Sequence, residues 1–316
     1  MMDYAKEILK GNLLAGSRLI RLLEEGDPQG IEELKILYPH TGKASVLGIT
    51  GPPGVGKSTI LNQLISEFRK REMRVGVVAV DPSSPISGGA ILGDRLRMGR
   101  HASDDGVFVR SMATRGHLGG LSKTTKEAFL VLDALGYDII FVETVGVGQD
   151  EVEVRNLVHT TAVISIPGMG DEVQAMKAGI LEIGDLYVVN KADLSGAEEV
   201  AQHLHVLIES RPARQDGWRP PVIMTAALKA EGIDELADAF INHRRHFADG
   251  DKLVDRLFEH EFSFFKQIVQ ETAAEKIFES VKDSDTYIDL LKALKERKID
   301  PYSAAQRLIE GLKCKI

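Results

Sequence analysis

The stretch GITGPPGVGKSTILNQL, residues 48–64, decides the fold of this chain of 316 residues. Its segment GPPGVGKS, residues 51–58, matches the pattern G-x4-G-K-S and lies between an apolar run typical of a strand and a run typical of a helix. Glycines at such a turn let backbone amides curl around phosphate oxygens, and the start of the helix adds partial positive charge. The stretch therefore predicts a phosphate-binding loop.

The residue types in this loop indicate how a nucleotide would be held. Lys57 is expected to reach the β- and γ-phosphates, and the hydroxyl of Ser58 is expected to ligate Mg²⁺. A glycine-rich turn that binds nothing is the alternative, and the strand-loop-helix context argues against it. The residues predicted to contact the phosphates are Gly51, Pro52, Pro53, Gly54, Val55, Gly56, Lys57, Ser58 and Thr59.

Short apolar runs rich in β-branched residues alternate with amphipathic stretches from residue 46 onward. Such alternation is typical of parallel strands covered by helices. We therefore predict an α/β fold of the P-loop NTPase class, a doubly wound and mostly parallel sheet whose ligand crevice lies at the carboxyl ends of its strands. The predicted strands are 46–50, 74–80, 107–112, 138–143, 161–167, 185–190 and 221–226.

Helical patterns flank the predicted sheet on both sides. Apolar residues recur at helical spacing in residues 3–23, up to the break GDPQG. A long amphipathic helix is predicted for 252–281, with further helices near 286–297 and after Pro301. The long apolar stripe of this last region favours a homodimer, and packing back on the chain's own domain is the alternative. The predicted domains are an N-terminal helical extension (1–42), a P-loop domain (43–246) and a C-terminal helical dimerisation region (247–316).

Composition excludes several classes of partner and compartment. The formal net charge of −8 offers no positive field for a nucleic-acid backbone or an anionic bilayer, so we expect no nucleic acid and no membrane as partners. No apolar run approaches the roughly 18 residues of a membrane span. The single cysteine, Cys314, excludes an internal disulfide, and the first residues lack the composition of a signal or transit peptide. We expect a cytoplasmic protein.

Carboxylates end two of the predicted strands. Asp81 and Glu143 each follow an apolar run, where a charged group needs a cation or hydrogen-bond donors. Beside a phosphate-binding loop, either residue can orient Mg²⁺ or its waters. Capping of the following helix is the alternative for each.

Two loops are predicted to change shape with the nucleotide. In ETVGVGQ, residues 143–149, the amide of Gly146 is expected to sense the γ-phosphate, and Gln149 is expected to position water. The segment 81–98 is rich in Gly, Pro and Ser and carries Asp94 near its end. Both loops are predicted switches ordered by the third phosphate, with ordinary surface loops as the alternative.

The segment NKAD, residues 190–193, follows a predicted strand and indicates which base is bound. Asp193 can accept hydrogen bonds from N1 and the exocyclic amino group of guanine, whereas adenine presents the wrong edge. Asn190 is expected to brace the loop and contact the base, and the alkyl stem of Lys191 is expected to cover the ring. GTP and GDP are therefore the predicted ligands. The residues predicted to contact guanine are Asn190, Lys191, Asp193 and, through their backbone, Ala226 and Ala227.

Several segments, taken in order, resemble the MeaB/ArgK family of GTPases, to which the human methylmalonic aciduria type A protein is related. They are GITGPPGVGKST, VDPSSPISGGAILGDRLRM, RSMATRGHLGG, ETVGVGQ and PGMGDEVQAMKAGILEIGDLYVVNKAD. The resemblance implies a homodimeric, Mg²⁺-dependent GTPase that acts as a chaperone for an adenosylcobalamin-dependent acyl-CoA mutase, usually methylmalonyl-CoA mutase. Such a GTPase gates cofactor loading and protects the mutase from inactivation.

The resemblance also implies roles for single residues. Lys177 matches a lysine of a third switch that supports partner-stimulated hydrolysis, although by itself it would be interpreted as a solvated lysine. His159 stands where the resemblance implies an acidic residue. Together with the motifs above, the predicted catalytic residues are Lys57, Glu143, Gln149 and Lys177, and the predicted Mg²⁺ ligands are Ser58, Asp81, Asp94 and Glu143.

Two other functions remain open from the sequence. A kinase acting on a protein or small molecule fits an older label of this family, a transport-system kinase for lysine, arginine and ornithine. It would need an acceptor pocket with its own base, and the chain contains no His-Arg-Asp signature. Insertion of nickel or cobalt is the second possibility, and it is weakened by the absence of a His-rich or Cys-rich tract.

Overall fold

Two compact units divide the chain, Met1–His260 and Glu261–Ile316. The fold is seen in a computed structural model of the protein. The structure describes residues 3–81, 101, 103–113, 120–144, 155, 157–168, 183–214, 216–248 and 252–313. In these ranges no helix combines the length and the apolarity needed to cross a bilayer.

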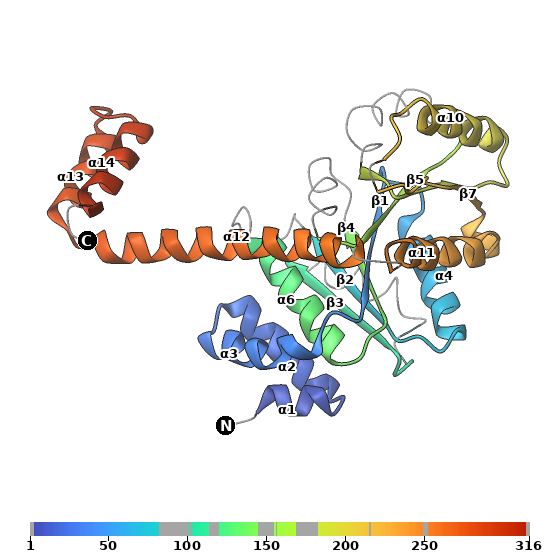
Figure 1. Ribbon diagram of the computed structural model, residues 1–316, viewed down its shortest axis with the longest axis horizontal. Coiled ribbons are helices and arrows are strands. Elements are labelled where there is room, and N and C mark those ends of the chain that lie inside the picture. The colour runs from blue at the N-terminus through green and yellow to red at the C-terminus, as the bar shows by residue number, and fades with distance from the viewer. Residues whose placement is uncertain are drawn as a thin grey trace. The chain divides into compact units, whose positions relative to one another are not determined.

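A single seven-stranded parallel sheet forms the centre of the first unit (Figure 1). Its order is β3-β2-β4-β1-β5-β6-β7, so β1 lies in the middle, with β2, β3 and β4 on one side of it and β5, β6 and β7 on the other. This arrangement confirms the predicted α/β, doubly wound P-loop NTPase fold and all seven predicted strands. The strands are β1 (Ser45–Thr50), β2 (Val75–Asp81), β3 (Val107–Ala113), β4 (Ile139–Thr144), β5 (Thr160–Ser165), β6 (Leu186–Asn190) and β7 (Val222–Thr225).

Helices α4 (Lys57–Lys70) and α11 (Ile233–Ala248) cover one face of the sheet. Successive strand residues alternate between faces, so Leu47 and Ile49 of β1 point into this layer. They pack with Phe68 of α4 and Phe240 of α11, all of them buried. Full burial of side chains of this size contributes about 1.5–3 kcal/mol each, which makes this layer the firm base of the loop that follows β1.

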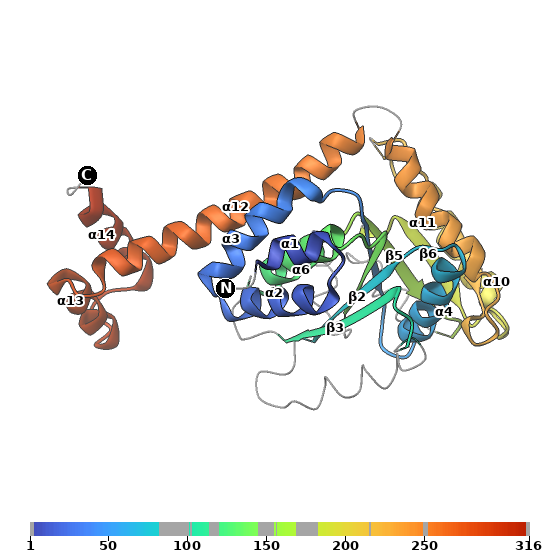
Figure 2. The same ribbon diagram turned by 90° about the horizontal axis from the view of Figure 1, so that it is seen from below.

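The opposite face is covered by two groups of helices, of which Figure 2 shows the N-terminal group beside β2 and β3. Helices α1 (Tyr4–Leu9), α2 (Leu13–Glu25), α3 (Pro28–Leu37) and α6 (Gly120–Ala134) share one core with β4 and β2, and α10 (Ala197–Glu209) packs on β5 and β6. The N-terminal helices therefore belong to the same compact unit as the sheet. The division at residues 42 and 246 stays a prediction.

The N-terminal helical region is more broken than its apolar spacing predicts. The helical spacing of residues 3–23 is divided between two helices, because Gly11 has a φ of 86° and the side chain of Asn12 accepts hydrogen bonds at the start of α2. The GDPQG break also begins a helix: Asp27 caps it, and Pro28 occupies the first turn, where a missing N–H costs nothing.

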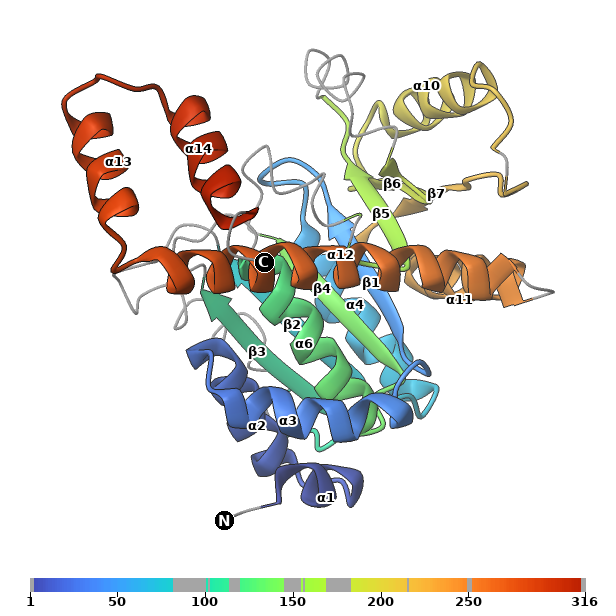
Figure 3. The ribbon, with the colours of Figure 1, turned by 60° about the vertical axis from the view of Figure 1, so that its left-hand side comes forward.

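Helices make up the described part of the second unit. It contains the later part of α12 (Lys252–Val281), followed by α13 (Asp285–Lys295) and α14 (Pro301–Lys313), and these bounds confirm the three predicted helices. Helices α13 and α14 lie side by side (Figure 3). Ser284 caps α13, and Asp300 accepts a hydrogen bond from the Ser303 amide in the first turn of α14.

Candidate nucleotide site

The glycine-rich loop leaves the carboxyl end of β1, the central strand. Gly51 and Gly56 have φ angles of 144° and 94°, in the region that favours glycine. A side chain on Gly51 would collide with the backbone carbonyl of Ile164 on the neighbouring strand β5, and one on Gly56 would collide with the amide of Asn190. Close approach and backbone conformation together require glycine at both positions.

The lysine of the loop points back onto it. Lys57 Nζ donates to the carbonyl oxygens of Gly51 and Pro52, the second at 3.0 Å. Lys57 also begins α4, and Gly56 at the preceding position supplies no side-chain cap. The ammonium group and the uncapped helix start therefore place positive charge on the same loop. A bound phosphate would exchange the carbonyl contacts of the lysine for stronger, charge-assisted ones.

A hydroxyl and a buried carboxylate meet beside the loop. Ser58 Oγ donates to Glu143 Oε1 at 2.5 Å, and Glu143 is 8% exposed. Glu143 lies on β4, in register with Ile49 of β1. Oxygen atoms of these two kinds are the ligands that Mg²⁺ prefers, directly or through water. Within the described ranges no group of three His, Cys, Asp or Glu side chains could hold a metal ion.

The NKAD segment is joined to the phosphate loop by the side chain of Asn190, which is 3% exposed at the end of β6. Its Nδ2 donates to the carbonyl of Val55 at 2.8 Å. Its Oδ1 accepts from Thr225 Oγ1 at 3.1 Å and from the Ala227 amide at 3.2 Å. Lys191, with a φ of 57°, donates to the carbonyl of Gly54 at 3.1 Å. One buried amide thus holds three loops together.

The carboxylate of Asp193 is paired rather than isolated. Asp193 Oδ2 lies 3.1 Å from Lys229 Nζ, and the two side chains are 35% and 54% exposed. The hydrogen bond from Lys229 lowers the pKa of Asp193 below its ordinary value. Asp193 is therefore ionised at neutral pH, and an ionised carboxylate only accepts hydrogen bonds. This matches the two donor groups on the edge of guanine.

Most of the residues predicted to contact the phosphates and guanine lie together at the carboxyl ends of the strands. Four predicted residues, Asp94, Gly146, Gln149 and Lys177, lie outside the described residues, and of Asp81 only the backbone at the end of β2 is described. Two neighbours were missed by the sequence analysis, Thr225 and Lys229. A hydroxyl at the end of the last predicted strand could have indicated Thr225, whereas no pattern indicated Lys229.

His159 lies away from this edge. It precedes β5, where its amide donates to the Val46 carbonyl at 2.8 Å and its Nδ1 accepts from the Val46 amide at 3.1 Å. All strands of the sheet run in the same direction, and His159 immediately precedes β5. It therefore lies at the amino ends of the strands, opposite to the phosphate loop. The residue thus joins two strands far from the phosphate loop.

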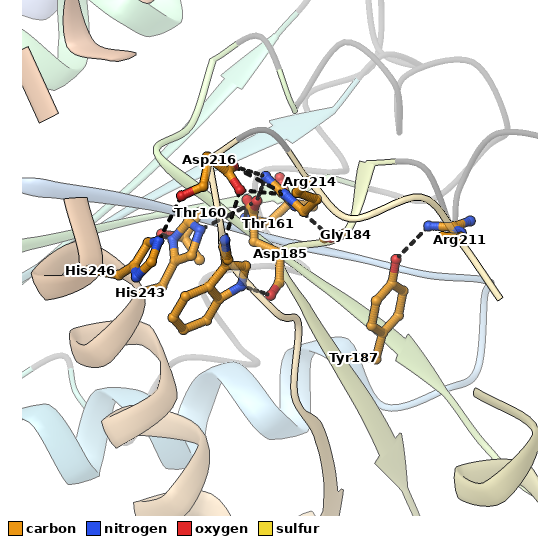
Figure 4. Close-up of polar contacts among 11 residues, drawn as sticks. Thr160, Thr161, Gly184, Asp185, Tyr187, Arg211, Arg214, Asp216, His243 and His246 are labelled. Carbon is orange, nitrogen blue, oxygen red and sulfur yellow. Dashed lines mark hydrogen bonds and ion pairs between the residues drawn. The ribbon is translucent and has the colours of Figure 1, made fainter. Parts of the chain in front are cut away.

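A second polar cluster also lies at the amino edge (Figure 4). Asp185, just before β6, accepts from the Thr161 amide at 2.9 Å and pairs with Arg214 at 3.0 Å. His243 of α11 lies 3.4 Å from Asp185 and shares a hydrogen bond of 2.7 Å with Thr160 Oγ1. The cluster joins β5, β6, α11 and the loop before β7.

Thr160, His243 and Asp185 contact one another in the sequence hydroxyl, imidazole, carboxylate, as in a catalytic triad. All three residues are buried, with exposed fractions of 1%, 1% and 3%. A substrate cannot reach a hydroxyl at that depth, so this arrangement is not a hydrolytic site. Its hydrogen bonds satisfy buried polar groups and stabilise the fold.

A parallel sheet with a glycine-rich loop after its central strand, opening a helix with Lys57, defines the class of P-loop nucleoside triphosphatases. Comparison with known families makes the assignment narrower. The family model described as "Methylmalonyl Co-A mutase-associated GTPase MeaB" matches residues 16–282. The chain belongs to this family of GTPases, and the predicted resemblance and enzyme class are confirmed.

Individual relatives agree with this assignment. A protein of Pyrococcus abyssi that carries a GTPase name is 46% identical over 312 residues, covering 98% of this chain and 96% of the relative. GTPase ArgK of Escherichia coli is 32% identical over 317 residues, with coverage of 98% and 96%. A solved structure described as the LAO/AO transport system kinase has a TM-score of 0.73 and 26% identity, and covers 98% of this chain and 96% of its own.

A mammalian relative has a name that refers to a metabolic condition. The methylmalonic aciduria type A homologue of Mus musculus, described as mitochondrial, is 34% identical over 273 residues. The match covers 84% of this chain and 65% of the mouse protein.

Proposed function

We propose that this protein is a GTP-hydrolysing chaperone that gates cofactor loading and protects an adenosylcobalamin-dependent acyl-CoA mutase of the methylmalonyl-CoA mutase type. The observation that carries the nucleotide part is the hydrogen bond between Asn190 and Val55, which joins the guanine motif to the phosphate loop. The family description, which names association with methylmalonyl-CoA mutase, supports the partner.

In the proposed reaction, water attacks the γ-phosphate of GTP. Lys57 and the backbone N–H groups of residues 54–59 hold the phosphates and neutralise charge that develops on them. The Ser58 hydroxyl and the Glu143 carboxylate, 2.5 Å apart, fit a Mg²⁺ ion as oxygen ligands. When bound, Mg²⁺ supplies Lewis-acid stabilisation of the phosphate oxygens. Asp193, Asn190 and the backbone of 226–227 select guanine.

Further roles are proposed for residues whose side chains the structure does not describe. Asp81 and Asp94 are proposed to help hold the metal. Gly146 is proposed to sense the γ-phosphate, Gln149 to position water, and Lys177 to neutralise transition-state charge once the mutase orders the switches. The radical chemistry of cobalamin belongs to the mutase in this proposal.

The protein is proposed to act as a cytoplasmic homodimer. Support comes from large apolar side chains exposed on α12: Phe258, Phe262, Phe265, Ile268, Val269 and Phe278. Exposed apolar area of this extent on one helix is typical of an interface.

The kinase alternative is not favoured. The matching family and the relatives from Pyrococcus abyssi and Escherichia coli are named as GTPases, whereas the similar solved structure has a kinase name. GTP labelled at the γ-phosphate separates the two reactions, because a GTPase releases the label to water and a kinase transfers it to an acceptor.

Co-purification from the native host tests the proposed function. We expect the tagged chain to retain an acyl-CoA mutase, and GTP turnover to rise when that mutase is added back. A variant with Lys57→Ala serves as the control, since it should lose turnover with and without the partner. Retention of no mutase, or a mutase that leaves GTP turnover unchanged, contradicts the chaperone role.

A further inference from the structure

The ion pair between Asp193 and Lys229 joins the two loops that are proposed to hold guanine. Lys229 Nζ lies 3.1 Å from Asp193 Oδ2. Lys229 ends the short 3₁₀-helix η3 (Ala227–Lys229), which follows β7, whereas Asp193 follows β6. Strands β6 and β7 are neighbours in the sheet, so the pair bridges two adjacent strand ends.

The backbone that carries Lys229 is fixed by the site itself. The Lys229 amide donates to the Ala226 carbonyl at 2.8 Å, and the Ala227 amide donates to Asn190 Oδ1 at 3.2 Å. Ala230, with a φ of 59°, ends the turn. Lys229 therefore lies on a loop that the buried Asn190 holds in place. The position of its backbone, from which the side chain reaches Asp193, is fixed.

The contact leaves the carboxylate able to accept from a base. A carboxylate has two oxygens and about four lone-pair directions, and guanine takes one direction on each oxygen. Lys229 pairs with Oδ2, and lone-pair directions on the carboxylate remain for the base. The χ2 torsion of an aspartate samples a broad range of angles, and a cation paired with one oxygen restricts that range. The hydrogen bond from Lys229 lowers the pKa of Asp193, and the hydrogen bond to Asp193, together with its negative charge, raises the pKa of Lys229.

We propose that Lys229 is a positioning residue for guanine selectivity: it orients the Asp193 carboxylate so that both oxygens meet the two donors of the base. This inference rests on the proposed role of Asp193 and deepens it. It predicts that Lys229 matters for a purine that uses both oxygens and much less for one that uses a single oxygen.

Calorimetric binding of GDP and IDP tests this, because inosine lacks the 2-amino group and has one donor for the carboxylate. In Lys229→Met we expect the GDP affinity to fall about three- to fivefold and the IDP affinity to change less than about twofold. Lys229→Arg should restore most of the GDP affinity. In an Asp193→Asn background, Lys229→Met should leave the ratio of GDP to IDP affinity unchanged, because the oriented group is gone.

The control variant is Lys35→Met, which removes an exposed lysine that pairs with Glu32 on α3 and should leave both affinities unchanged. Equal losses for GDP, IDP and ADP would show general attraction of phosphates and overturn the inference. Tighter GDP binding by Lys229→Met would show that the lysine competes with the base and would also overturn the inference. An unchanged GDP affinity would overturn it as well. A wild-type protein that binds ADP as tightly as GDP overturns the role of Asp193 itself. A selective wild type with an unchanged ratio in Lys229→Met overturns only the role of Lys229.

Discussion

The side-chain amide of Asn190 donates a hydrogen bond of 2.8 Å to the backbone carbonyl of Val55, joining the loop after β6 to the loop after β1. The same side chain accepts from Thr225 and Ala227 beyond β7. Three strand ends that lie far apart in sequence are thus held by one residue with 3% exposure. The loops proposed to hold the phosphates and the base are consequently joined through the side chain of Asn190.

Replacing Asn190 with alanine should weaken the fold and the site together. The buried groups that lose this partner cost about 1–3 kcal/mol of unfolding free energy. We expect GDP affinity to fall at least tenfold, because the two loops are no longer held in register. Denaturant unfolding and calorimetry measure the two effects. Asn12→Ala is the matched control: it removes the cap of α2 and about 1 kcal/mol of stability, but should leave GDP affinity unchanged. An Asn190→Ala protein with wild-type affinity would refute this coupling.

The elements that the sequence predicted well are those with strong local patterns. The strands are short runs in which apolar, β-branched residues dominate, since a parallel sheet covered on both faces buries most of its side chains. The helix 252–281 has a long amphipathic period and lacks Gly and Pro, so its bounds match the prediction. Recognition of the loop at 51–58 needed only spacing and context.

Other features depend on single side chains or distant pairs. The break at Gly11 and the start of α3 at Pro28 depend on the capping residues Asn12 and Asp27 within an otherwise continuous helical pattern. The pairing of Lys229 with Asp193 depends on the adjacency of β6 and β7, which no local pattern specifies. Residue chemistry could therefore indicate which motifs are candidates for binding nucleotide, but not the contacts between those motifs.

Glu143→Gln tests the magnesium proposal, because it keeps the shape of the side chain next to Ser58 and removes its charge. We expect GTP turnover to fall about 100-fold and the Mg²⁺ concentration for half-maximal turnover to rise. GDP binding in the presence of EDTA should stay unchanged. The control, Glu24→Gln, removes a half-buried carboxylate that pairs with Arg110 and should leave the Mg²⁺ dependence unaltered. Normal turnover in Glu143→Gln would exclude Glu143 from the metal site.

Asp104 provides a prediction of pH dependence. Arg69 donates to both oxygens of Asp104 at 3.0 Å, and this hydrogen bonding lowers the pKa of the Asp104 carboxyl. Because the folded pKa lies below the unfolded value of about 3.9, its contribution is fully present above that pH and is lost as pH falls through the folded pKa. The pair is about one-third exposed, so the contribution is at most about 1 kcal/mol.

We therefore expect Asp104→Asn to be less stable than wild type at pH 7, with a difference that shrinks below about pH 4. Thermal unfolding across pH measures it. Gly106→Ala should give the same profile, since its new side chain would overlap the guanidinium of Arg69. Glu25→Gln, which breaks an exposed pair with Arg21, should show no such profile. A constant difference from pH 3 to pH 7 would exclude titration of Asp104 as the cause.

Asp193→Asn should change which purine is bound. The side-chain amide of asparagine has an oxygen that can accept from N1–H of xanthine and an NH₂ group that can donate to its 2-oxo group. Guanine presents donors at both positions. We expect GDP affinity to fall at least tenfold and XDP affinity to rise, with ADP unchanged. Asp238→Asn, an exposed carboxylate on α11, serves as the control. An unaltered order of affinities would remove Asp193 from the base site.

The exposed aromatic stripe of α12 predicts the oligomeric state. Phe258, Phe262, Phe265 and Val269 follow steps of four, three and four residues, the spacing of a helix seam, and are 63%, 46%, 58% and 47% exposed. Burial of one phenylalanine is worth about 1.5–3 kcal/mol, so Phe265→Glu should weaken a homodimer at least tenfold. Sedimentation velocity should show a dimer for wild type and a monomer for the variant, with GDP affinity preserved in both. Gln270→Glu adds the same charge away from the stripe and should remain dimeric. A monomeric wild type, or a Phe265→Glu variant that stays dimeric, would show that this stripe is not the dimer interface.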